Sequence, residues 1–142
     1  MEKNIFDLQR FANIHNDKKK AVVNGTNDND TIENQGKNAI INALGGDDSI
    51  RNYSGHNSTI NAGAGDDDIL NNRGRSAIID GGAGNDYIRN EEYSHSASIN
   101  GGAGNDSIYN DSHSTGVTLN GGDDDDLISN VGNGGIDQGS GL

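Results

Sequence analysis

A ten-residue phrase recurs along this chain, and the recurrence limits the folds open to it. GGAGNDYIRN begins at Gly81, and GGAGNDSIYN begins twenty residues later at Gly101, with eight of ten positions identical. The Asp in the sixth place of the phrase recurs in six units, at spacings of 18 to 20 residues. These six are Asp30, Asp48, Asp67, Asp86, Asp106 and Asp126. Repeats of this period build solenoids, in which each unit buries its apolar face by stacking on the next.

Other positions of the unit are equally constant. An Ile stands two residues after each Asp, an Asn stands four residues after it, and an aliphatic residue stands seven residues before it. This half of the unit contains no insertions, whereas the other half varies in length. Because surface loops tolerate insertions, the variable half is predicted to contain a surface turn. The constant half is predicted to have the same backbone conformation in every unit.

Two segments of each unit have the alternation of short strands. Residues 67–71 read DDILN, and residues 77–79 read AII. Side chains alternate between the two faces of a strand, so Ile69 and Ile79 can both point into one interior. We therefore predict an all-β fold. Its expected form is a right-handed parallel β-solenoid, or β-roll, of about six coils formed by residues 21–142, with stacked ladders of Ile, small residues and Asn.

The composition indicates that burial alone does not stabilise this fold. The 142 residues include 22 Gly and no Cys or Pro, only 30% are apolar, and the net charge is −12. Such chains are ordinarily disordered, and stacked acidic turns repel one another, so cations are the expected partners. The negative charge argues against nucleic-acid binding, and the lack of Cys excludes disulfides and thiolate zinc sites. No apolar run is long enough for a membrane span.

The phrase also matches a known pattern. GGAGNDYIR and GGAGNDSIY fit G-G-x-G-x-D-x-U-x, where U is aliphatic, and over residues 24–130 the chain resembles the RTX, or hemolysin-type, calcium-binding repeat family. AGAGDDDIL, GGDDDDLIS, ALGGDDSIR and GTNDNDTIE depart from the pattern at one or more glycines. The resemblance implies a parallel β-roll with Ca²⁺ between stacked turns. The motif recurs every 18 to 20 residues rather than every nine, which implies one row of about five ions on one side.

Calcium takes six to eight hard oxygen ligands, and the unit offers several. We predict that the motif carboxylates are the side-chain ligands, and the alternative is that they only cap the turns. The resemblance implies further ligands from the carbonyls of glycines in the second and fourth places. These glycines are Gly63, Gly65, Gly82, Gly84, Gly102 and Gly104. The fifth-place residues are predicted to point outward.

Residues 1–20 lack the motif and are predicted to be a separate leader or capping segment. Ile5, Leu8 and Phe11 are spaced for one face of a short helix, which either covers the first coil or docks to a partner. The segment has no continuous apolar stretch, so no classical signal peptide is visible. At the other end, Ile136 and Asp137 begin a further coil, and an open solenoid end exposes unpaired strand edges.

Two functions fit these observations. The first is a secreted, extracellular bacterial module that binds calcium and folds on binding it, as the resemblance implies. The second is a structural or adhesive extracellular protein whose copies stack end to end into Ca²⁺-dependent fibres. No enzyme is predicted, because no spacing of Ser, His and Asp matches a known catalytic arrangement and a thin solenoid offers no pocket.

Overall fold

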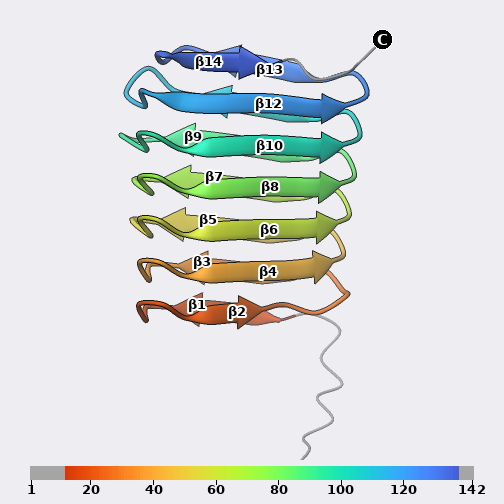
Figure 1. The fold of residues 1–142 in the computed structure, drawn as a ribbon. Helices are drawn as coiled ribbons and strands as arrows, with labels where there is room; N and C mark the ends of the chain where they lie inside the picture. Colours follow the sequence, from red (N-terminus) through yellow and green to blue (C-terminus); the bar gives the residue numbers. More distant parts are fainter. Residues whose placement is uncertain (1–11, 138–142) are drawn as a thin grey trace, which may run out of the picture.

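The computed structural model, which describes residues 12–137, is a parallel β-solenoid of seven coils (Figure 1). Each coil contributes one strand to each of two seven-stranded sheets. The described residues contain no helix, and thus none long and apolar enough to cross a membrane. The predicted all-β solenoid is therefore confirmed.

The two sheets take alternate strands along the chain. The odd sheet contains, in spatial order, β1 (Asn13–Asn16), β3 (Thr31–Asn34), β5 (Ser49–Tyr53), β7 (Asp68–Asn72), β9 (Tyr87–Glu91), β11 (Ser107–Asn110) and β13 (Leu127–Asn130). The even sheet contains β2 (Val22–Asn24), β4 (Ile40–Gly45), β6 (Thr59–Ala64), β8 (Ile78–Ala83), β10 (Ser98–Ala103), β12 (Val117–Asp123) and β14 (Gly134–Asp137).

Equivalent residues of successive coils lie side by side. All strand pairs are parallel, and the register places Ile69 between Ile50 and Ile88 in the odd sheet. In the even sheet, Ile79 lies between Ile60 and Ile99. The inward aliphatic side chains of both sheets form the core, and those of the interior coils are almost completely buried. The absence of insertions in the constant half of each unit keeps these ladders in register, because a slip of one residue would turn every side chain to the other face.

A ladder of Asn side chains runs beside the Ile ladder of the odd sheet. Each Asn donates its Nδ2 hydrogen to the Oδ1 of the Asn in the next coil, at N···O distances of 2.6–2.8 Å. The ladder contains Asn16, Asn34, Asn52, Asn71, Asn90, Asn110 and Asn130. Nδ2 also donates to a carbonyl of the following turn, as from Asn71 to Gly74 at 2.8 Å. Buried amides require such complete pairing, which explains why no other residue occurs at this place.

The turns lie along two opposite edges of the solenoid. The motif turns, which contain the glycine-rich phrase, lead from each even strand to the next odd strand, at the right-hand edge of Figure 1. The variable turns lead from each odd strand to the next even strand along the left-hand edge. The half-unit that tolerates insertions is therefore confined to one edge.

The number of coils corrects the prediction of six. Residues 13–16 form β1 and pair with β3, which puts Ile14 beside Ile32 and adds a seventh coil before the first motif. Ala12 stands where the other coils have Asp, so a search aligned on Asp misses this coil. Part of the predicted 1–20 segment is thus strand. Ile5, Phe6, Leu8 and Phe11 lie outside the described residues.

Candidate metal centre in the motif turns

The motif Asp side chains line up inside one edge of the solenoid. Asp30, Asp48, Asp67, Asp86 and Asp106 are buried, with exposed fractions of 1–3%, although each lies in a turn. From Asp48 to Asp126, each motif Asp accepts at its Oδ1 the backbone N–H of the Asp one coil earlier, and Asp30 accepts the N–H of Ala12 in the same way. The N···O distances between motif Asp residues are 2.7–2.9 Å, from the Asp30 N–H to Asp48 through to the Asp106 N–H to Asp126. The carboxylates are therefore fixed in single file, one per coil.

In five of the six motif carboxylates the second oxygen has no partner. This Oδ2 is buried and unbonded in Asp48, Asp67, Asp86, Asp106 and Asp126. A buried polar atom without a hydrogen bond is costly, and a native protein usually has a specific reason for it. Five such atoms in a repeating row form a regular feature of the fold, and each offers a free hard-oxygen ligand.

The same environment disfavours the charged form of the carboxyl groups. Burial raises the pKa of Asp48, Asp86 and Asp106 to about 6 and that of Asp67 to about 7. The N–H from the preceding Asp lowers each pKa, but nearby carboxylates raise it again. A cation beside the row would remove this penalty, because opposite charge favours the ionised form.

Asp30 differs from the rest of the row. Its Oδ2 accepts the backbone N–H of Thr26 at 2.6 Å, and its Oδ1 accepts the Thr26 hydroxyl at 3.0 Å. Thr26 occupies the second place of the degenerate first unit, where four of the other five units have glycine. The Asp30 carboxylate is therefore capped by its own turn and has the least need of a metal ion.

The predicted glycine ligands have a steric role that is plain in the structure. Gly82 and Gly84 have φ values of 109° and 133°, a region that favours glycine. A Cβ at Gly82 would collide with the carbonyl of Gly63, and one at Gly84 would collide with the carbonyl of Gly65. Gly102 and Gly104 have the same relation to the coil before them. These carbonyls thus face the glycine of the next coil.

Carbonyls that lie beside the unpaired oxygens belong to first-place glycines, which were not among the predicted ligands. A Cβ at Gly81 would meet both Oδ2 of Asp86 and the carbonyl of Gly101. The same holds for Gly101 with Asp106 and the carbonyl of Gly121. A carboxylate oxygen and a carbonyl oxygen therefore face one small space. The sequence indicates that this position is sterically restricted, because the first place of every unit is Gly or Ala.

The fifth-place residues form a second ladder, on the outside of the turns. Their exposed side-chain oxygens accept the backbone N–H of the equivalent residue one coil later, at 2.7–3.0 Å. The predicted outward direction is confirmed for these side chains. The inner ladder bonds toward the preceding coil and the outer ladder toward the following coil, so both fix the spacing of the turns.

This arrangement fits a hard divalent cation. Within residues 12–137 no three His, Cys, Asp or Glu side chains converge on one point, so each ion would need backbone carbonyls beside its carboxylate. The motif turns supply oxygen ligands of both kinds, and glycine leaves space for them. Oxygen-only coordination of this type suits Ca²⁺ better than a transition metal.

Comparisons with protein-family models, with characterised proteins and with solved structures found no significant match. The architecture itself, two stacked parallel sheets with coils of about 19 residues, is compatible with a β-roll.

Proposed function

We propose that this chain is a calcium-binding, RTX-like repeat module that folds when it binds Ca²⁺. The observation that carries the proposal is the single row of five buried, unpaired Oδ2 atoms in the motif turns. The match of two units to the RTX pattern supports calcium as the ion, and it also supports secretion to the extracellular space. The proposal assigns no catalytic role to the chain.

The residues would act as follows. Asp48, Asp67, Asp86, Asp106 and Asp126 would each supply a carboxylate oxygen, and the glycine-rich turns would supply carbonyls from adjacent coils. Calcium provides the positive charge that this row lacks. About five ions would add a charge of +10 to the formal −12 and leave a net charge of −2. Metal binding of this kind supplies folding free energy directly.

A calcium titration followed by far-ultraviolet circular dichroism tests the proposal. We expect a largely disordered chain in chelator and a β-rich chain in excess Ca²⁺. Asp86→Asn should raise the calcium midpoint several-fold, because it removes a charge from the row while keeping an oxygen for the Asp67 N–H. Asp66→Asn is the matched control, since Asp66 is exposed in the outer ladder of the same region.

Two results would count against the proposal. A complete β-sheet spectrum in excess chelator would show that calcium is not needed for folding. Equal midpoints for the Asp86 and Asp66 variants would show that net charge matters and that no site exists. Equilibrium dialysis should give about five ions per chain, fewer than the six motif Asp residues, because Asp30 is already capped.

A structural role in fibres is the second candidate. The last described coil exposes Leu127, Val131 and Ile136 by 69%, 59% and 48%. Among the described residues, β13 and β14 each pair with a strand on one side only. Exposed strand edges next to apolar side chains favour pairing with another molecule, and the association experiment in the Discussion separates this candidate from the first.

A further inference from the structure

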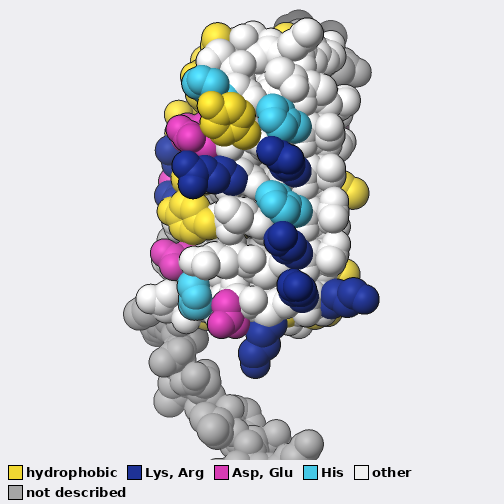
Figure 2. Space-filling view, turned by 90° about the vertical axis from the view of Figure 1, so that its left-hand side faces the viewer, with side chains coloured by type: hydrophobic (Ala, Val, Ile, Leu, Met, Phe, Trp, Pro, Cys, Tyr) yellow, Lys and Arg dark blue, Asp and Glu magenta, His cyan; other side chains and the backbone are white. Residues whose placement is uncertain are grey.

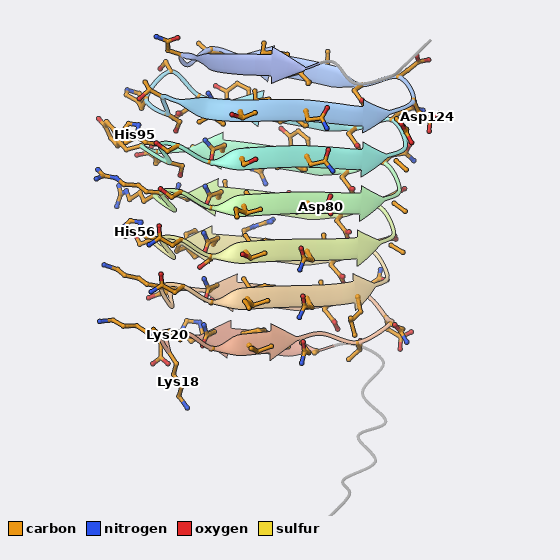
Figure 3. All side chains as sticks on the ribbon, viewed as in Figure 1. Lys18, Lys20, His56, Asp80, His95 and Asp124 are labelled. Atoms are coloured by element: carbon orange, nitrogen blue, oxygen red, sulfur yellow. The ribbon has the colours of Figure 1, made fainter. Side chains whose placement is uncertain are left out.

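Charge is divided between the two edges of the solenoid. The motif turns contain 11 of the 22 acidic residues and no Lys or Arg. Six of the eight Lys and Arg residues described lie instead on the variable turns, Lys18, Lys19, Lys20, Lys37, Arg73 and Arg75. Figure 3 shows this division, with Lys18, Lys20, His56 and His95 at the edge opposite Asp124.

Five of the residues on the variable turns form a straight row. Backbone hydrogen bonds of 2.8–2.9 Å between successive coils hold this row in place. The N–H of Lys20 donates to the carbonyl of Lys37, that of Asn38 to His56, that of Asn57 to Arg75, and that of Ser76 to His95. The basic row, as we call it, consists of Lys19, Lys37, His56, Arg75 and His95, and Figure 2 shows its blue and cyan side chains in single file. Successive members lie one coil apart, about 4.8 Å.

The charge of the basic row is not neutralised within the described part of the chain. Arg51 and Arg89 both pair with Asp68 on the odd sheet, and Arg73 lies 3.7 Å from Glu92. No described carboxylate forms such a pair with Lys19, Lys37 or Arg75. Burial lowers the pKa of His56, and Lys37 and Arg75 on either side lower it further, as like charges in one row would.

A hollow adjoins the row at its middle. It has a volume of about 370 Å³ and is lined by Ser54, His56, Arg73, Arg75 and Tyr93. The Tyr93 ring is half exposed and is flanked by the rings of His95 and His113, with centroids 6.1 and 5.1 Å away. His56 accepts the Arg75 N–H at Nδ1, at 3.1 Å, so the neutral ring presents its Nε2–H as a donor.

We propose that the basic row and this hollow bind a linear acidic polysaccharide. A single file of three cationic side chains and two imidazoles, one per coil, suits a linear polymer that carries anionic groups along a chain of hydrogen-bonding sugar units, and the strand spacing is close to the length of one sugar unit. The hollow offers a sugar ring an exposed aromatic face, two guanidinium groups, and a hydroxyl and an imidazole for hydrogen bonds. Tyrosine suits such a site because its ring is rigid and its hydroxyl is polar.

Other anionic partners fit less well. Nucleic acid has a denser row of phosphates, about one charge per 3.4 Å of each strand of a duplex, and the acidic body of the protein repels it. An anionic membrane would require a broad basic face, whereas this row is one residue wide. If calcium occupies the opposite edge as proposed above, the net charge falls to near zero. The rest of the molecule then no longer repels an anionic polymer from the basic row. The row itself shares no residue with the proposed calcium sites.

Binding to dextran sulfate, with unsulfated dextran as the neutral control, tests the proposal in calcium-containing buffer. In about 0.1 M salt we expect Lys37→Gln/Arg75→Gln to weaken binding about tenfold, as the loss of two exposed ion pairs predicts. Lys18→Gln/Lys20→Gln removes the same charge from the first variable turn, outside the basic row, and should weaken it much less. Tyr93→Ala should weaken binding several-fold without changing the charge.

Three results would overturn the proposal. These are no binding to dextran sulfate, equal weakening by the two double variants, and tighter binding of an oligothymidylate or of anionic phospholipid vesicles. The calcium midpoint of each variant, measured by circular dichroism, checks that the fold is intact. Because calcium binding is scored separately, either proposal can fail while the other stands.

Discussion

At the scale of single residues, each motif Asp except Asp30 has one oxygen held by a backbone N–H and one buried oxygen without a partner. This asymmetry makes protons and cations compete for the same atom. The pKa values are raised to about 6 for Asp48, Asp86 and Asp106 and to about 7 for Asp67. Ionisation of these buried groups therefore destabilises the calcium-free fold at neutral pH.

A pH dependence follows for the calcium-free protein. The folded pKa values lie above the unfolded value of 3.8, so between them the folded state binds more protons than the unfolded chain. The free energy of unfolding should thus rise as the pH falls from about 8 to about 5. One pKa unit corresponds to about 1.4 kcal/mol, and four groups shift in the same direction.

Circular dichroism in calcium-free buffer would measure this effect as β-structure gained, or urea midpoint raised, at the lower pH. Excess calcium should reverse the dependence, because protons then compete with the metal ion. A calcium-free protein that loses β-structure as the pH falls from about 8 to about 5 would contradict the burial of these carboxyl groups.

At the scale of strands and ladders, the two rows of Asn side chains offer a direct comparison. Asn71 lies in the buried ladder and bonds to Asn52, Asn90 and the carbonyl of Gly74. Asn71→Ala should lower the free energy of unfolding by roughly 3–5 kcal/mol, because it leaves several buried polar groups unpaired. Urea unfolding in calcium measures the change.

Asn61 provides the control for this substitution. It donates to Asn42 at 2.9 Å in an equivalent row, but on the exposed face of the even sheet. Water replaces the lost partner there, so Asn61→Ala should cost less than about 1 kcal/mol. Similar losses for the two variants would mean that the buried ladder adds nothing beyond strand pairing.

The ladders are also the part of the fold that the sequence predicts best. Ile69, Asn71 and Ile79 follow from alternation and a constant frame, because identical spacing forces identical residues to stack. The coil of Ile14 and Asn16 could not be found in this way, since Ala12 replaces its Asp and the sequence before it contains no glycine-rich phrase.

Contacts between coils were harder to predict than positions within them. The cap of Thr26 on Asp30 depends on local backbone geometry, which the repeat pattern does not encode. The first-place carbonyls were missed because the motif shows which residues are small, but not which atoms they face. The basic row needs the register of the variable turns, whose lengths differ from coil to coil.

At the scale of the whole molecule, the two ends of the solenoid are unlike its middle. In the last described coil Ile136 occupies the inward aliphatic position beside Leu119, yet it is 48% exposed because no described coil covers it. At the first coil, residues of β1, β2 and the turn between them line a hollow of about 400 Å³. Each end thus offers surface that a further coil could bury.

We expect the chain to associate end to end in calcium. Edge pairing is favourable wherever nothing covers the edge, and contact between unlike ends of identical molecules does not close, so it produces filaments. Ile136→Lys should block association while leaving the monomer folded, because a charge would then stand where the next coil must stack and the half-exposed side chain can reach water. Light scattering over a range of protein concentrations, with electron microscopy, would detect the filaments.

A truncated chain of residues 12–142 separates the roles of the two ends. This boundary keeps β1 in place, whereas removal of residues 1–20 would delete a strand of the first coil. Filaments from the truncated chain alone would assign a capping role to residues 1–11, since exposure of the first coil would then be the step that permits stacking. Filaments from both forms would leave the first coil accessible in the full chain. Monomers from both forms in calcium would rule out the fibre function and leave the calcium-binding module as the better account of the repeat.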